Sequence, residues 1–435
     1  MKRTLSVLLV SLVSASAWGA DLMSVYRDAL EYDARFAAAK AQREAGQEKT
    51  VQGRAGVLPG IGMSASTTWN DNTYSGADRS FNSNSYGAEL RQPLFNRAAW
   101  TQYEQGKLQT TLSDTQFELA RQDLILRVSE AYFAVLNAQD ASEALRALRT
   151  AATQQLELAK KSFEVGTVTV TDVHEAQSRF DLASARLIAA ENELEVARQR
   201  LAQIVGKAPE GVAGLRKGAE LGRPQPDDMR QWVSAAEQDS FSVQVQQIAT
   251  RIADREVTRN ESGHLPTLDV VARYNQSDAG GSSFGSGRSE NTIRTIGLEL
   301  NVPIYQGGGV SSRTREAAAL LTKSEADLDD ARRSAALAAR QAYLGVTSGL
   351  AQVKALEAAE VSSRSALEAN RLGYEVGVRI NIDVLNAQSQ LADTQQQLAK
   401  ARYDTLIAQL RLSAAAGTLG EEEVARLNAL LTGTP

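Results

Sequence analysis

The stretch FEVGTVTVTDVHEAQ at residues 163–177 is nearly repeated by YEVGVRINIDVLNAQ at residues 374–388. Seven of the fifteen aligned residues are identical, and the second phrase begins 211 residues after the first. Further pairs recur at similar offsets: LPGIGMSA at 58 and LPTLDVVA at 265, QPLFN around Pro93 and VPIYQ around Pro303, AYFAVLNAQ at 131 and AYLGVTSGL at 342. Internal repeats indicate architecture directly. The sequence therefore predicts two copies of one unit of about 210 residues.

The composition favours long helices over a sheet-rich enzyme. The 435 residues include only 8 Pro, 31 Gly and 9 Phe, while Ala, Leu, Gln, Glu and Arg fill most of the length. Such a composition is typical of coiled coils. The formal net charge of −5 gives no reason to expect a nucleic-acid partner. With no cysteine, the chain has no thiolate metal ligand and no lipid-anchored cysteine at its start.

Residues 1–20, MKRTLSVLLVSLVSASAWGA, have the pattern of a secretory signal peptide. Lys2 and Arg3 precede an apolar run, and small residues follow, so cleavage is expected between Ala17 and Ala20. No other stretch approaches the roughly 18 consecutive apolar residues of a membrane helix. We therefore expect the chain to cross the inner membrane and to remain outside the cytoplasm.

Each repeat unit is predicted to contain a helix, a β-hairpin and a helical hairpin, in that order. The first unit covers 21–226, with a helix at 21–52, a β-hairpin at 61–94 and a helical tip near 166–171. The second covers 227–416, with a helix at 227–262, a β-hairpin at 267–304 and a tip near 377–382. A tail at 417–435 follows.

The helical hairpins have unusually long outgoing helices. Residues 107–165 contain no Gly or Pro, which predicts a helix of about 90 Å at 1.5 Å per residue. Shorter helices are expected to run back at 172–205 and 384–416. Two short helices stacked end to end would cover one long helix in a coiled coil. A soluble coiled-coil rod explains these helices equally well.

The predicted strands alternate between apolar and polar residues. The apolar face is formed by Ile61, Met63, Ala65, Thr67 and Trp69 in the first hairpin and by Ile296, Leu298, Leu300, Val302 and Ile304 in the second. Polar loops are expected at 70–85 and 275–292. Proline is expected to mark the strand limits, with Pro59 and Pro266 before the hairpins and Pro93 and Pro303 closing them.

This alternation is typical of transmembrane β-strands, although an ordinary half-buried hairpin shows it too. Four strands cannot close a barrel, and open sheet edges are not tolerated in lipid. One chain therefore cannot satisfy its own backbone in a membrane. Three chains would supply about 12 strands, so the transmembrane interpretation requires an oligomer.

The sequence resembles the TolC family of bacterial outer-membrane export channels. The resemblance rests on the duplicated unit, the Leu-Pro strand starts, the QPLF and VPIYQGG strand ends and both E-V-G/D-V phrases. The resemblance covers the whole mature chain. It implies a mixed, mainly α fold in which a homotrimer forms a 12-stranded transmembrane β-barrel with four strands per chain. A long antiparallel α-helical coiled-coil tunnel continues this barrel through the periplasm. Residues 206–226 and the tail would form an irregular belt around the tunnel.

The resemblance also implies location, partners and cargo. The channel would lie in outer-membrane lipid of a Gram-negative bacterium, with most of the chain in the periplasm. It would be engaged by a periplasmic adaptor, also called a membrane fusion protein, and an inner-membrane transporter of the ABC, resistance-nodulation-division or major-facilitator type. Cargo would be proteins (type I secretion), small toxic compounds, or both. The missing lipid-anchor cysteine favours the branch where type I secretion is common.

Residues at the tips carry the roles that the resemblance implies. Gly166 and Gly377 would end the long helices where positive φ is required and would form the tip turns that contact the adaptor. Asp172 would bind Tyr374 and Arg379 and hold the entrance closed. A solvated loop charge is the plainer interpretation of Arg379.

A lumen constriction is expected at Asp383 and Asn386, one helical turn apart. The family carries aspartate at both positions, so the amide here is a departure. A single acidic ring implies a weaker cation preference. Asp172 and Asp383 are also well placed to cap the returning helices or to favour their N-terminal dipoles.

No catalytic, cofactor-binding or metal site is expected. His174 and His264 are the only histidines, and neither has ligand-forming neighbours in sequence. The Gly-rich stretches at 280–287 and 306–309 lack the G-K-[ST] ending of a phosphate loop. The sequence therefore does not predict an enzyme. The alternative from another class is a soluble periplasmic coiled-coil adaptor or structural protein.

Overall fold

The computed structural model describes residues 20–74, 77–207, 211–216, 218–281 and 287–432. All but Ala20 of the predicted signal peptide lies outside these residues. The chain divides into two compact units. The first comprises Met1–Ala37, Arg121–Val233 and Leu337–Pro435, and the second Ala38–Ala120 and Ser234–Ala336. Each unit draws on both predicted repeats.

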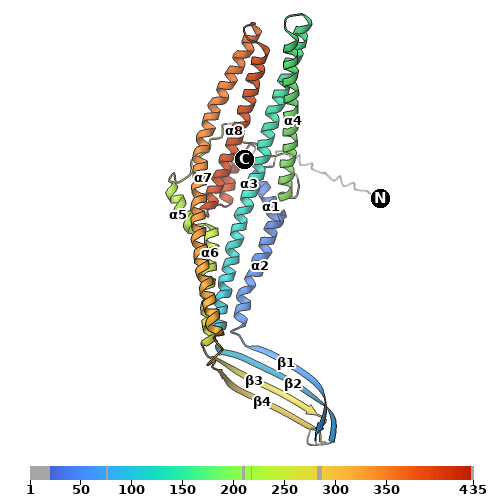
Figure 1. Cartoon of the computed structure of the whole chain (residues 1–435), viewed down its shortest axis with the longest axis vertical. Coiled ribbons are helices and arrows are strands. Elements are labelled where there is room, and N and C mark those ends of the chain that lie inside the picture. Colours follow the sequence, from blue (N-terminus) through green and yellow to red (C-terminus); the bar gives the residue numbers. More distant parts are fainter. Residues whose placement is uncertain (1–19, 75–76, 208–210, 217, 282–286, 433–435) are drawn as a thin grey trace, which may run out of the picture. The chain divides into compact units, whose positions relative to one another are not determined.

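The second unit contains one antiparallel sheet with the strand order β1-β2-β3-β4 (Figure 1). Its strands are β1 (Gly60–Tyr74), β2 (Ala77–Phe95), β3 (Thr267–Ala279) and β4 (Ser289–Asn301). The four predicted strands are therefore confirmed. Within the described chain β1 and β4 are the sheet edges, each with one neighbour.

The strand register gathers the apolar residues on one face. Ile61 lies opposite Leu90, Leu90 opposite Ala272, and Ala272 opposite Ile296. Because directly opposed residues share a face, this row runs across all four strands. The apolar face remains exposed in one chain, with Met63 88% and Ile296 80% accessible.

The strands are longer than predicted: most of the expected loop at 70–85 is strand, and strand takes up both ends of the expected loop at 275–292. β1 continues to Tyr74, and β2 begins at Ala77. Polar side chains continue the pairing here, since Asp71 lies opposite Ser80, whose hydroxyl donates to the Asp71 carboxylate at 2.7 Å. Backbone pairing needs no apolar side chain, so a pattern based on hydrophobic alternation ends too early.

Proline marks three of the four strand limits as expected. Pro59 and Pro266 each precede the first residue of a strand, and Pro303 follows β4. β2 does not close at Pro93 but continues to Phe95, with a register shift between the two residues. A bulge accommodates the missing N–H of proline within a strand.

The helices of the second unit lead into and out of this sheet. They are most of α2 (Ala34–Ala55), α6 (Phe241–Glu261), the 3₁₀ turn η1 (Ser262–His264) and the first parts of α3 (Arg97–Glu164) and α7 (Gly309–Glu375). Small residues let α2 and α3 approach closely. The hydroxyl oxygens of Thr50 on α2 and Thr110 on α3 lie 2.8 Å apart.

The first unit holds both helical hairpins (Figure 1). Its other helices are α1 (Leu22–Tyr32), α4 (Val170–Val205), α8 (Asn381–Ala415) and α9 (Glu421–Asn428), and α5 (Met229–Asp239) begins in it. The segment after α4 meets the tail, since Leu215 forms a β-bridge with Leu431. No helix in the described ranges is both long and apolar enough to cross a membrane.

Candidate functional site

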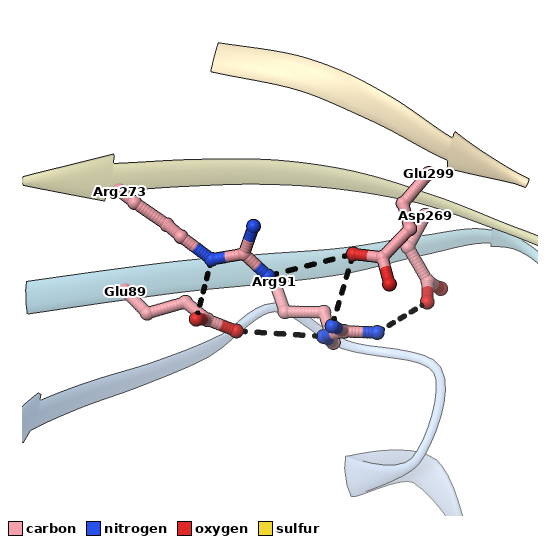
Figure 2. A network of polar contacts seen from close by, with 5 residues as sticks. All are labelled: Glu89, Arg91, Asp269, Arg273 and Glu299. Atoms are coloured by element: carbon pink, nitrogen blue, oxygen red, sulfur yellow. Dashed lines mark hydrogen bonds and ion pairs between the residues drawn. The ribbon is translucent and has the colours of Figure 1, made fainter. Parts of the chain in front are cut away.

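The polar face of the sheet carries a network of five charged side chains. Figure 2 shows Glu89, Arg91, Asp269, Arg273 and Glu299 directed toward one another above β2, β3 and β4. The Arg91 guanidinium reaches Asp269 at 2.8 Å and Glu299 at 3.2 Å. Arg273 contacts the Glu89 carboxylate at 2.8 Å. Three strands are therefore linked by side chains as well as by their backbones.

The strand register explains this network. Glu89 lies directly opposite Arg273, which gives a favourable cross-strand pair. Asp269 lies opposite Glu299, where two like charges would repel. Arg91 contacts both of these carboxylates and offsets the repulsion. The sheet thus has one charged face and one apolar face, an arrangement suited to a wall between water and lipid.

The two helical tips end in the same turn. Gly166 and Gly377 have φ of 76° and 78°, which confirms the positive φ expected of them. In both turns the backbone N–H of the residue after the glycine donates to a backbone carbonyl oxygen in the last turn of the helix. Thr167 donates to Ser162 and Val378 donates to Gly373, each at 2.9 Å. This is the Schellman pattern, which satisfies helix carbonyls that otherwise lack donors.

Replacing either tip glycine by alanine is expected to destabilise its turn by about 1–2 kcal/mol, because a Cβ is unfavourable at positive φ. No other atom lies within 4 Å of the added Cβ at Gly166 or Gly377, so backbone strain is the only cost. Hydrogen exchange at the ends of α3 and α7 should accelerate several-fold. Gly211→Ala is the control, since Gly211 has open space and no positive φ. Equal exchange in tip and control variants would contradict the expectation.

Asp172 caps α4 as predicted. Thr169 is the N-cap, and its backbone N–H donates to the Asp172 carboxylate at 2.8 Å. The Asp172 N–H donates in return to the Thr169 hydroxyl at 3.3 Å, which completes a capping box. The side-chain hydrogen bond from Thr169, followed by the backbone bond, lowers the pKa of Asp172 below its usual value.

The other predicted entrance residues are arranged differently. Asp383 makes no cap, because α8 begins after Ile380 without a side-chain cap, and its carboxylate lies 3.7 Å from the Arg379 guanidinium. Tyr374 packs beside Leu367 and Val384 and lines a cavity of about 530 Å³. No hydrogen bond or ion pair joins Asp172 to Arg379 or Tyr374 within the described part of one chain.

Asn386 has a partner that sequence analysis missed. Its amide oxygen accepts from the Arg179 guanidinium at 2.9 Å, a contact between α8 and α4. The sequence contained a signal for this contact. Asp172 and Arg379 are a predicted pair, and Arg179 and Asn386 each lie seven residues, one heptad, after a member of that pair. Both Asp383 and Asn386 therefore have an arginine beside them.

The first unit also holds a buried ion pair that no sequence pattern indicated. Asp33 lies between α1 and α2, and both of its oxygens contact Arg127, at 2.8 and 3.0 Å. His174 and His264 are exposed. Among the described residues, no three His, Asp or Glu side chains are grouped to hold a metal ion.

Comparison with known proteins gives consistent matches. The family described as outer membrane efflux protein matches residues 25–207 and 232–418. The outer membrane protein TolC of Vibrio cholerae is 33% identical over 419 residues, which cover 96% of this chain and 95% of that protein. The alkaline protease secretion protein AprF of Pseudomonas aeruginosa is 34% identical over 427 residues, with 95% and 88% covered.

A solved structure has the same fold. The CmeC outer membrane channel of Campylobacter jejuni superposes with a TM-score of 0.79 at 17% identity. The superposition covers 95% of this chain and 90% of that one.

Proposed function

Because the chain belongs to the outer membrane efflux protein family, we propose that three copies of it form the exit duct of a tripartite export system. The observation that carries this proposal is the four-stranded sheet with an exposed apolar face, a charged opposite face and two edges. Open edges are unsatisfied in lipid, and closure removes them. Three such sheets joined edge to edge give about 12 strands.

The partners proposed are a periplasmic adaptor and an inner-membrane transporter. Apolar residues at the two tips support contact with another protein, since Val165, Val376 and Val378 are 75%, 65% and 75% exposed. Val376 and Val378 flank Gly377 in one turn, and exposed apolar groups that gather at one place favour association. The turns at Gly166 and Gly377 would hold them in place.

Either class of cargo is compatible with the relatives. The proteins AprF of Pseudomonas aeruginosa and PrtF of Dickeya chrysanthemi are named for protease secretion. BepC of Brucella suis is named an outer membrane efflux protein. We assign this chain the duct, through which secreted proteins, small toxic compounds or both would pass.

The entrance of the duct would lie at the helical tips. We assign Asp172, Tyr374 and Arg379 to its gate, and Asp383 and Asn386 to its constriction. Asp172 would have to share its carboxylate between the α4 cap and the gate, which a carboxylate with two oxygens permits. Arginine beside both constriction positions implies a weak cation preference.

Conductance in planar lipid bilayers tests the duct and its gate together. The purified parent should pass a small current, and Arg379→Ser should increase that current several-fold, because the variant loses a donor that would hold the gate. Arg364→Ser is the matched control, since Arg364 is exposed and pairs only one turn away on its own helix with Glu360.

The outcomes are separable. A current that is equal in the parent and the Arg379→Ser variant would keep the duct and remove Arg379 from the gate. No current from folded, detergent-extracted protein would instead favour the coiled-coil rod.

A further inference from the structure

The returning helices α4 and α8 lie against each other along a seam of apolar residues. Ala176 and Ala183 of α4 share one buried cluster with Leu385 and Ala392 of α8. In each helix these residues are seven positions apart, which is the repeat of a coiled coil. Both helices start at a tip, so they run in the same direction (Figure 1).

Two polar contacts follow the same repeat along the edge of this seam. Arg179 donates to the Asn386 amide oxygen at 2.9 Å, and the Arg186 guanidinium lies 3.5 Å from the Asp393 carboxylate. The partners are 207 residues apart in both cases. Each arginine comes from the first hairpin and each acceptor from the second, so both contacts join the two hairpins of one chain.

Apolar packing is incomplete at this level of the seam. A cavity of about 40 Å³ is lined by Arg179 and Arg186 themselves, together with Leu148, Ala152, Leu182, Ala183, Leu385 and Ser389. Both arginines border this pocket, so their contacts cross between the hairpins beside a gap in the apolar packing.

The polar pairs do not continue away from the tips. At the next position of the repeat, Glu193 and Lys400 are again 207 residues apart. Glu193 instead contacts Arg200 of its own helix at 3.6 Å, and Lys400 contacts Asp404 of its own helix at 2.6 Å. The contacts between the hairpins through this repeat are thus confined to the part of α4 and α8 nearest the tips.

We propose that Arg179 and Arg186 form a latch that holds the two hairpins of one chain together and keeps the entrance closed. This inference rests on the proposed function. Any widening that moves one hairpin relative to the other must break both contacts. Asp172 and Arg379 are also 207 residues apart and lie one heptad nearer the tip, so the assigned gate pair would be the first member of the same series.

The two contacts differ in kind. Arg179 donates a hydrogen bond to the neutral amide oxygen of Asn386 at 2.9 Å. Arg186 and Asp393 form an ion pair at 3.5 Å between side chains that are each about half exposed. Exposed pairs of this kind contribute about 0–1 kcal/mol each, so removal of both contacts should open the entrance further than removal of either one.

The test measures conductance in planar bilayers for charge-removing variants. Arg179→Gln with Arg186→Gln should raise the current several-fold over the parent, and Arg186→Gln alone should give a smaller rise. Arg200→Gln is the matched control: it lies on α4 two heptads beyond Arg186, and its ion pair stays within that helix. Its current should equal that of the parent.

A charge swap distinguishes a latch from a general packing role. Arg186→Asp should raise the current, and adding Asp393→Arg should return it to the parent level, because the pair is restored in reverse. Packing alone gives no reason for such a rescue.

The proposal is overturned if the Arg179→Gln, Arg186→Gln variant conducts like Arg200→Gln, or if the swap does not rescue. A parent that passes no current would overturn the proposed function and the latch with it. Should the double variant fail to assemble, the single variant and the swap decide the matter.

Discussion

Asp33→Ala is expected to lower the free energy of unfolding of the first unit by about 3–5 kcal/mol, the usual cost of breaking a buried ion pair from one side. The side chains of Asp33 and Arg127 are only 6% and 18% exposed, and two hydrogen bonds join them. Asp33 also accepts the Phe36 N–H at 2.7 Å and so caps α2. The variant leaves the Arg127 guanidinium without its buried partner.

The matched control is Asp123→Ala. Asp123 contacts the same arginine at 2.7 Å, but its side chain is 58% exposed. Exposed pairs contribute about 0–1 kcal/mol. Denaturant unfolding in detergent should therefore separate the two variants clearly. Equal losses of stability would show that burial of the Asp33–Arg127 pair is not what stabilises this unit.

The same pair predicts a pH dependence. The Arg127 side-chain hydrogen bond holds the pKa of Asp33 below its ordinary value of 3.8. Because the folded-state pKa is lowered, the stabilisation is fully present above the unfolded-state value and is lost as pH falls through the folded-state pKa. The parent melting temperature should fall on acidification below about pH 4, and Asp33→Asn should remove that part of the fall.

Gly106→Ala is expected to destabilise the second unit by about 1–3 kcal/mol, the range for overpacking. A Cβ at this position would lie 2.4 Å from the backbone carbonyl oxygen of Lys49 on α2. A backbone atom cannot swing away like the end of a flexible side chain, so α2 and α3 would have to separate. The close approach extends along the helix pair, because a Cβ at Gly53 would lie 3.0 Å from the backbone carbonyl oxygen of Gln102.

Gly345→Ala is the comparison, since the same change in α7 meets only the Ala408 Cβ, at an ordinary 3.5 Å. Alanine is favoured over glycine by roughly 1 kcal/mol inside a helix. We therefore expect opposite signs from one substitution at two helical positions. Denaturant unfolding measures both, and a stabilising Gly106→Ala would contradict the packing of α2 on α3.

Local patterns were sufficient for much of the fold. Tip glycines at 166 and 377, the cap at Asp172 and the alternation in four strands all depend on neighbours within a few residues. The prediction failed where the alternation of apolar and polar residues stops. The stretch at 70–85 was expected to be a loop because its residues are mostly polar, but it is mostly strand.

Contacts between distant segments were beyond local patterns. Asp33 and Arg127 are 94 residues apart, and Arg179 and Asn386 are 207 apart. The residues beside Asp33 and Arg127 do not indicate that pairing, and Arg179 and Asn386 share only the heptad spacing from the predicted gate pair. The repeat supplies a common spacing for α4 and α8, but only the structure shows which edge of each helix faces the other.

Native mass spectrometry of the detergent-extracted protein tests the central claim most directly, because a sheet with two open edges cannot face lipid alone. We expect a species of three chains, in which β1 of each chain pairs with β4 of another. A folded, stable single chain would contradict it, since one chain offers only four strands.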